Sequence, residues 1–220
     1  MKPTVIYEDE AILVVNKPSG LIVYPDGKHD YPALSNWLAE KYGEGNFHFI
    51  HRIDRETSGI LVVAKTEEAH AFLKQQFAER EIKKIYRAFI YGGLKDDRGI
   101  IDKPIGSARG GMGPRSATRP HGVQREAITA YSVRARGTEA TYVDVFPKTG
   151  RTHQIRVHFS AIQHPIINDV LYAPSRPPLL GFKRLALHAL SLTFTHPNGK
   201  EMTLEAPLPE DFLEAEKLLG

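Results

Sequence analysis

FHFIHRIDRETSGILVVA, residues 47–64, contains two apolar runs separated by a charged segment. Phe47–Ile50 and Ile60–Ala64 are rich in aliphatic and aromatic residues, which is typical of short β-strands. Residues 51–59 between them carry both signs of charge and end in Ser58-Gly59, which is typical of a loop. The stretch therefore predicts a charged loop presented by two strands.

The rest of the chain predicts an α+β fold. Further strands are expected over Val5–Tyr7, Ile12–Val15, Leu21–Tyr24, Ile85–Tyr91, Ala127–Val133, Thr141–Phe146, Leu185–Thr195 and Glu201–Leu204. Apolar residues at helical spacing predict helices over Pro32–Tyr42 and Pro209–Leu219, and two more that Thr66 and Thr152 would cap, the latter ending near Ile162. Because strands dominate and often follow one another, we expect a largely antiparallel, mixed central sheet flanked by helices and loops, in one domain over residues 1–220.

Composition excludes several classes of protein. The 220 residues include no cysteine, which excludes disulfides, cysteine-ligated zinc and thiol catalysis. No signal-peptide core and no membrane-spanning apolar run is found, so we expect a cytoplasmic protein without a membrane partner.

A basic segment lies between Lys103 and Arg125. It carries five lysine or arginine side chains and no aspartate or glutamate, and its glycines predict a flexible loop. Such a loop can bind phosphates without reading sequence. A solvated loop without a partner is the alternative.

Asp54 is the first candidate for chemistry. It lies in the charged loop between Arg52 and Arg55, whose positive charges favour its ionised form. An ionised carboxylate on a rigid scaffold can act as a nucleophile or a base. An aspartate that only stabilises a turn is the alternative.

Two further segments combine basic and aromatic side chains. Arg151 lies in KTGRTHQIR, residues 148–156, at the expected start of a helix, where an arginine makes sense if an anion must be held. Tyr86 lies in KKIYRA, residues 83–88, and in strand alternation shares a face with Lys84 and Ala88, where it could stack on a base. A surface arginine and a packed strand tyrosine are the alternatives.

No cofactor is indicated. No phosphate-binding glycine motif follows a strand, and His153, His158, His164 and His188 lack the spacing of a metal motif, so we expect structural histidines, no metal and no cofactor.

Taken together, the motifs resemble the RluA-type pseudouridine synthases. HRIDRETSGIL, residues 51–61, is similar to the family signature, with Ile53 where leucine is usual. Other matching motifs follow in the family's order: NKPSG at 16–20, KIYRA at 84–88, GRTHQIRVH at 150–158, HPIIND at 164–169 and RLALHA at 184–189. The resemblance covers about Val5–Pro207. It implies a pseudouridine synthase fold with a central cleft, and a catalytic domain without the S4 RNA-binding domain that many relatives carry in front.

The resemblance also implies roles for matched residues. Asp54 would be the catalytic aspartate, oriented by an ion pair with Arg151, and Tyr86 would pack against the uracil. Arg52 would enter the RNA stack, and Leu187 would line the uracil pocket. Arg55 and His51 are further candidates for substrate binding.

The expected activity is isomerisation of uridine to pseudouridine in structured RNA, either ribosomal or transfer RNA, by a monomer. A non-catalytic RNA-binding module of the same fold and an RNA base glycosylase are the alternatives.

Overall fold

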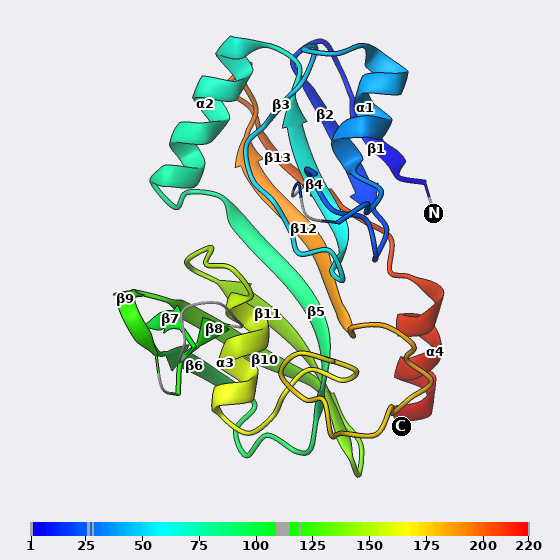
Figure 1. Cartoon of the computed structure of the whole chain (residues 1–220), viewed down its shortest axis with the longest axis vertical. Coiled ribbons are helices and arrows are strands. Elements are labelled where there is room, and N and C mark those ends of the chain that lie inside the picture. The colour runs from blue at the N-terminus through cyan, green and yellow to red at the C-terminus, as the bar shows by residue number, and fades with distance from the viewer. Residues whose placement is uncertain (1, 26, 28, 109–114, 119, 220) are drawn as a thin grey trace. The chain divides into compact units, whose positions relative to one another are not determined.

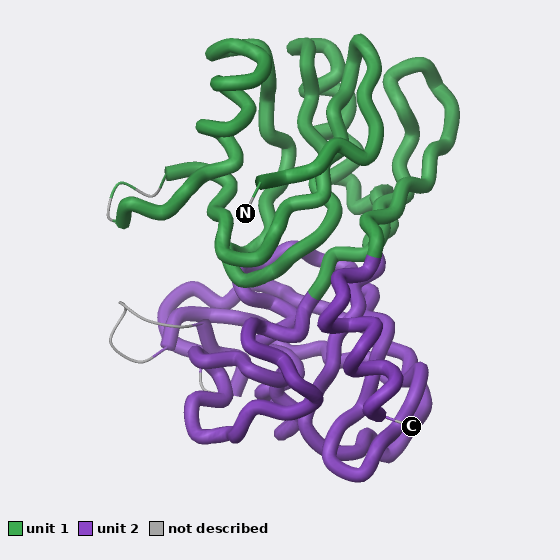
Figure 2. Tube along the Cα trace, turned by 90° about the vertical axis from the view of Figure 1, so that its right-hand side faces the viewer, with its two compact units in different colours: residues 1–84, 188–207 green, residues 85–187, 208–220 purple. Residues whose placement is uncertain are grey.

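The computed structural model describes residues 2–25, 27, 29–108, 115–118 and 120–219. Contacts within the chain divide it into two compact units (Figure 2). Unit 1 comprises residues 1–84 and 188–207, and unit 2 comprises residues 85–187 and 208–220. Both units are therefore built from two separate stretches of the chain. The expectation of a single domain stays a prediction.

Unit 1 combines a mostly antiparallel sheet with two helices (Figure 1). Its strands are β1 (Thr4–Glu8), β2 (Ile12–Lys17), β3 (His48–Phe49), β4 (Ser58–Ala64), β12 (Leu187–Thr195) and β13 (Glu201–Glu205), and its helices are α1 (Leu34–Tyr42) and α2 (Glu67–Ala78). β2 runs antiparallel to β4, whereas β12 pairs with β4 in parallel through His188 and Ala189. Every residue of β4 is buried, so this strand forms the centre of the unit.

Unit 2 contains two sheets and two helices. Strands β5 (Lys83–Tyr91), β11 (Ala140–Pro147), β10 (Ile128–Arg136) and β6 (Arg98–Asp102) follow one another in antiparallel order. A small second sheet has the order β8 (Arg115–Ser116), β7 (Ile105–Ser107) and β9 (His121–Arg125). The helices are α3 (Gln154–Ala161) and α4 (Glu210–Leu219).

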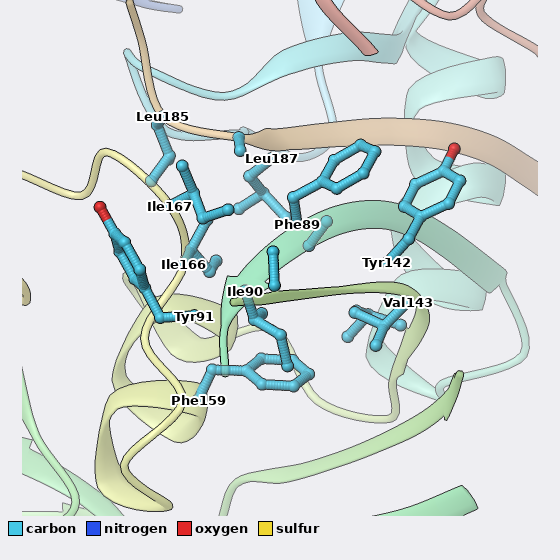
Figure 3. Close-up of a cluster of buried hydrophobic side chains, with 14 of the residues drawn as sticks. Phe89, Ile90, Tyr91, Tyr142, Val143, Phe159, Ile166, Ile167, Leu185 and Leu187 are labelled. Carbon is cyan, nitrogen blue, oxygen red and sulfur yellow. The ribbon is translucent and has the colours of Figure 1, made fainter. Parts of the chain in front are cut away.

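The core of unit 2 combines aromatic and aliphatic side chains (Figure 3). The rings of Phe89 and Tyr142 stack at 4.2 Å between centroids, while Phe182 packs tilted and Phe212 edge-on against Phe89. Leu187 belongs to the same cluster and is labelled beside Phe89. Burial of such side chains contributes about 1.5–3 kcal/mol each, so β5 and β11, which present Phe89 and Tyr142, are held firmly.

The structure confirms the predicted α+β class with its largely antiparallel sheet. The helix after Thr66 is also confirmed, because Thr66 Oγ1 accepts a hydrogen bond from the backbone N–H of Ala69 at 3.1 Å. Glu67 and Glu68 occupy the first turn of this helix, where negative charge is favourable.

Three local predictions were wrong. Leu21–Tyr24 is not a strand, because the Leu21 carbonyl accepts a hydrogen bond from Lys17 Nζ, and only an isolated bridge joins Ile22 to Ala33. Thr152 does not cap α3; the N-cap is His153, in the left-handed conformation and without a side-chain capping bond. The basic segment is not only a loop, since its described residues form β7, β8 and β9, while residues 109–114 and 119 lie outside the described part.

Candidate active site

Asp54 lies in the loop of residues 50–57 that joins β3 to β4 in unit 1. Exposure alternates along this loop: Arg52 is exposed, Ile53 is buried at 5% exposure, and Asp54 is half-buried. Ile53 therefore anchors the loop in the core beside the carboxylate. The Asp54 carbonyl accepts a hydrogen bond from the Thr57 N–H at 3.2 Å, which closes a turn directly after Asp54.

The buried ammonium of Lys17 holds the backbone of this loop. Its Nζ donates hydrogen bonds to the carbonyl oxygens of Pro18 at 3.0 Å, Leu21 at 2.7 Å and Arg55 at 3.1 Å, and its side chain is fully buried. The Arg55 carbonyl also accepts from the Gly20 N–H at 2.8 Å. A buried ammonium is costly unless its hydrogens are bonded, and here three carbonyl acceptors satisfy it.

Ser19 adds a second link between the two segments, because its Oγ donates to the Glu56 carbonyl at 2.7 Å. The segment Asn16–Gly20 is thus a bracket that fixes the residues following Asp54. Residues that are far away in sequence therefore position the backbone that presents the carboxylate.

Gly59 ends the charged segment at a point of very close backbone approach. A Cβ on this residue would lie 2.1 Å from the Ala189 carbonyl oxygen, and its φ is +119°. Only glycine fits, because a side chain would collide with backbone and the conformation disfavours other residues. Ser58 Oγ and His188 Nδ1, 2.9 Å apart and buried, join the same two strands.

His51 is built into the structure of unit 1. Its Nε2 accepts a hydrogen bond from the Val62 N–H at 3.1 Å, and its ring stacks on Phe77 of α2 at 4.6 Å. Burial, with a smaller contribution from the positive charge of Lys84, lowers the pKa of His51 to about 3. His51 is therefore neutral at physiological pH and packs the loop against α2; its role in substrate binding stays a prediction.

The two arginines that flank Asp54 differ in their surroundings. The Arg55 guanidinium lies 4.1 Å from the centre of the Tyr31 ring and forms an ion pair with Glu56 at 2.8 Å. Arg52 is exposed, as is Tyr24 at 43%; partial burial raises the pKa of the Tyr24 phenol, and the positive charge of Arg52 lowers it by a smaller amount. Unit 1 thus brings His51, Arg52, Asp54 and Arg55 together on one loop, with Arg52 directed to solvent.

In unit 2, Arg151 lies in the segment that leads into α3. Its backbone N–H donates to Gln154 Oε1 at 3.0 Å, and its Nε donates to the Glu126 carbonyl at 3.0 Å. The Gln154 N–H in turn donates to the Arg151 carbonyl at 3.0 Å, so residues 151–154 form a closed turn. Arg151 therefore precedes the helix and does not occupy its first turn.

Gln154 is the centre of the hydrogen bonds around this turn. Its Oε1 also accepts from Thr149 Oγ1 at 2.7 Å, and its Nε2 donates to the Ile128 carbonyl at 3.0 Å and to Thr129 Oγ1 at 2.9 Å. The side chain is buried at 4% exposure. One amide therefore ties the Arg151 turn to the start of β10.

Tyr86 and Leu187 occupy different positions in unit 2. Tyr86 is half-buried in β5, opposite Val145 of β11, and packs against the aromatic core. Leu187 is only 3% exposed and lies within that core (Figure 3). Tyr86 therefore presents part of its ring at the surface of the unit, whereas Leu187 supports the strand from inside.

The described part of the basic segment is open to solvent. All five residues of β9, His121–Arg125, are exposed, and so is Arg115 in β8. The four histidines considered from sequence have hydrogen-bond partners: Tyr172 for His153, Thr129 and Lys103 for His158, Tyr91 for His164 and Ser58 for His188.

Sequence reasoning assigned no role to Lys17 or Gln154. Each lies in a motif that the resemblance included, but a lysine in a turn and a glutamine in a helix predict exposed side chains. The signal for Lys17 was its place at the end of the buried run Ile12–Val15, where the chain turns beneath the charged loop.

Within the described residues, no helix is both long and apolar enough to cross a membrane.

Comparison with known proteins gives a consistent picture. Residues 11–161 match the family model described as RNA pseudouridylate synthase. The chain is 38% identical to the ribosomal large subunit pseudouridine synthase D of Pseudomonas aeruginosa, over 95% of this chain and 69% of the relative. The protein of the same name from Zymomonas mobilis is 37% identical, over 98% and 72%.

A solved structure agrees with these matches. The structure titled human RNA pseudouridylate synthase domain containing 1 has a TM-score of 0.79 and 28% identity, and the match covers 94% of this chain and 84% of that one.

Proposed function

Because this chain belongs to the RNA pseudouridylate synthase family and is an RNA-modifying isomerase, we propose that Asp54 is the residue that carries its chemistry. The proposal extends to a uridine in ribosomal or transfer RNA as the substrate. Ribosomal RNA of the large subunit is the first substrate to test, because the relatives from Pseudomonas aeruginosa and Zymomonas mobilis are named for it.

The observation that supports Asp54 most is the construction of its loop. Buried Ile53 anchors the residue before it, and Lys17 and Ser19 hold the backbone of the two residues after it. A half-buried carboxylate on such a fixed backbone is preorganised, which a reacting group requires. An aspartate that only stabilised a turn would not need a buried ammonium beneath it.

The reaction breaks the N1–C1′ bond of uridine, turns the detached uracil and joins C5 to C1′. The hydrogen on C5 is lost as a proton and N1 gains one, so the product is an isomer of the substrate. Asp54 can serve in two ways: its carboxylate attacks C1′, or it withdraws the 2′ proton to give a glycal. Both routes need an ionised carboxylate that is aimed at the sugar.

We assign supporting roles to residues of unit 2. Arg151 would form an ion pair with the Asp54 carboxylate and keep it charged, and the turn built on Gln154 would hold Arg151 for this purpose. Tyr86 would stack on the uracil, which is worth about 1–3 kcal/mol for a base on an aromatic ring. Leu187 would provide apolar surface behind the base.

Arg52 and the basic segment would bind the RNA itself. A base inside a duplex must leave its stack before its glycosidic bond can be reached, at a cost of a few kcal/mol. Exposed Arg52 would fill part of the space that the base leaves, with Arg55 and His51 beside it. Arg115 and Arg125, both exposed, would contact phosphates and position the RNA without reading its sequence.

The first test is Asp54→Asn, with Asp30→Asn as a control at an exposed position of unit 1. We expect tritium release from RNA labelled at uridine C5 to fall by more than about 10⁴-fold, as for loss of other nucleophiles, while RNA affinity stays near wild type. Full activity of the variant would remove Asp54 from this role. Free uracil from the wild-type protein would indicate a glycosylase, and RNA binding without either product would indicate a binding module.

The second test is Arg151→Ala. We expect turnover to fall by about 10²–10³-fold, with a loss of at most about 1 kcal/mol in folding stability, because the side-chain bond to the Glu126 carbonyl is exposed. Arg151→Lys keeps the positive charge but not the planar guanidinium, so its turnover should lie between that of the wild type and that of Arg151→Ala. A large drop in the thermal midpoint with little change in turnover would assign Arg151 a structural role instead.

A further inference from the structure

Three side chains of unit 1 outside the proposed active site converge on one point. His48 lies in β3, and Glu67 and His70 lie in the first turn and a half of α2 (Figure 1). His48 Nδ1 is 3.6 Å from Glu67 Oε1, and His70 Nδ1 is 3.9 Å from Glu67 Oε2. One potential ligand atom from each of the three residues lies within 4.8 Å of the other two.

The local fold explains why the three side chains meet. His48 pairs directly with Ala64, the last residue of β4. The chain then turns through Lys65 and Thr66, and the Thr66 cap fixes the start of α2 three residues beyond Ala64. Residues three apart on a helix share a face, so Glu67 and His70 both point back toward β3.

The distances show that hydrogen bonds do not join the two histidines to Glu67. Separations of 3.6 and 3.9 Å are too long for hydrogen bonds between ring nitrogen and carboxylate. Ligand atoms around a tetrahedral zinc ion, at bond lengths of 2.0–2.2 Å, lie roughly 3.3–3.5 Å apart. The two histidine–glutamate separations exceed that range by up to about half an ångström, and the three ligand atoms lie within 4.8 Å of one another, so side-chain rotations must bring them closer around a bound ion.

The two imidazoles lie next to each other. The rings of His48 and His70 stack at 5.5 Å between centroids and 27° between planes, and each side chain is 24% exposed. Partial burial limits the rotamers that must be ordered on binding, while Glu67 at 76% exposure leaves the site open to ions from solvent. Two imidazoles and one carboxylate select zinc and neighbouring transition metals over magnesium or calcium.

We propose that His48, Glu67 and His70 form a surface site for a divalent transition-metal ion of the zinc class, with a water in the fourth position. The bound ion joins β3 to α2, and β3 leads directly into the loop of Asp54. The site takes no part in the proposed isomerisation, so the inference stands independently of it.

Calorimetric titration of the metal-free 220-residue chain with zinc chloride tests this proposal. We expect one zinc ion per chain, and we expect His48→Ala, His70→Ala and Glu67→Gln each to weaken binding more than the roughly 10–100-fold that loss of an outer-shell partner causes.

Two matched variants control for unspecific binding. Glu68→Gln removes the same charge from the same helical turn, and His121→Ala removes an exposed imidazole from β9; both should bind zinc like wild type. Zinc should raise the thermal midpoint of the wild type and of these controls, but not that of Glu67→Gln. Absence of zinc binding by the wild type, or the same affinity and stoichiometry in Glu67→Gln, would overturn the proposal.

Discussion

The loop of Asp54 in unit 1 and the turn of Arg151 in unit 2 are held by different means. Lys17, which reaches the carbonyl of Arg55, lies 38 residues away in the chain and uses a buried charge. Gln154, which binds the N–H of Arg151, is only three residues away and uses a neutral amide. Both supports also reach residues far away in sequence, since Gln154 Nε2 donates to the Ile128 carbonyl and to Thr129 Oγ1; they differ in that one is a buried charge and the other a neutral amide.

This difference predicts different consequences when the two supports are removed. Loss of Lys17 should disturb the fold of unit 1 together with the Asp54 loop. Loss of Gln154 should disturb the position of Arg151 more than the stability of the chain. Lys17 and Gln154 therefore provide a matched pair of positions for mutation.

Lys17→Met should have the larger effect. It removes the donor for three carbonyl oxygens and replaces it with a side chain of similar length that cannot bond them. Hydrogen bonds to charged groups contribute about 1.5–3 kcal/mol each, and carbonyls left without partners add to the loss. We expect about 3 kcal/mol or more, measured by urea unfolding, together with a strong loss of turnover.

Lys200→Met controls for the loss of a lysine, because Lys200 is exposed. It should change stability by no more than about 0.5 kcal/mol. If Lys17→Met proved as stable and as active as this control, the bracket of residues 16–20 would not be what holds the Asp54 loop.

Gln154→Met should have the smaller effect on stability, about 2 kcal/mol, since other contacts of β10 and α3 remain. Turnover should fall by more than the loss of folded protein accounts for, because the Arg151 N–H and Thr149 Oγ1 lose their common acceptor and Arg151 is no longer held in place. Gln75→Met, at an exposed position of α2, is the control. If turnover fell only in proportion to the fraction of folded protein, Gln154 would have a structural role alone.

These two supports also show where sequence reasoning stopped. Local features were predicted well: Thr66 caps α2, and Ile60–Ala64 lies in a fully buried strand. Leu21–Tyr24 was predicted as a strand because its residues have strand character, but Lys17 Nζ binds the Leu21 carbonyl. Because this hydrogen bond comes from the side chain of an earlier residue, Lys17, the composition of residues 21–24 does not reveal it.

The candidate site divides in the same way. The charged loop around Asp54, Arg151 and Tyr86 were candidates from the sequence alone, and the resemblance supplied the roles expected of them. Gln154 and the cluster of His48, Glu67 and His70 were not found, because their partners come from separate elements whose pairing fixes the geometry. Strand register, such as His48 opposite Ala64, is decided by the packed sheet and not by either strand alone.

His51 of unit 1 and His158 of unit 2 should both make the stability of the fold decrease at acid pH. His51 in unit 1 has a pKa lowered to about 3, mainly by burial, and burial also lowers the pKa of His158 in unit 2. In the unfolded chain both histidines take up protons near pH 6.5. Between that pH and the lower folded pKa, the unfolded state therefore binds more protons, and stability falls as the pH falls.

His51→Gln removes one of the two imidazoles that bind a proton in the unfolded chain and not in the folded one. At pH 7.5 the variant should be less stable than wild type by about 1 kcal/mol, because it loses the stack on Phe77. Below pH 6.5 the wild type should lose up to about 1.4 kcal/mol per pH unit more than the variant, so the two stability curves should converge and then cross. Urea unfolding at pH 7.5, 6, 5 and 4.5 measures this. Parallel curves would mean that the pKa of His51 is the same in the folded and unfolded protein, so that the folded protein binds this proton at acid pH as readily. The Val62 N–H would then not be bonded to the His51 ring, and this bond would not hold the Asp54 loop against α2.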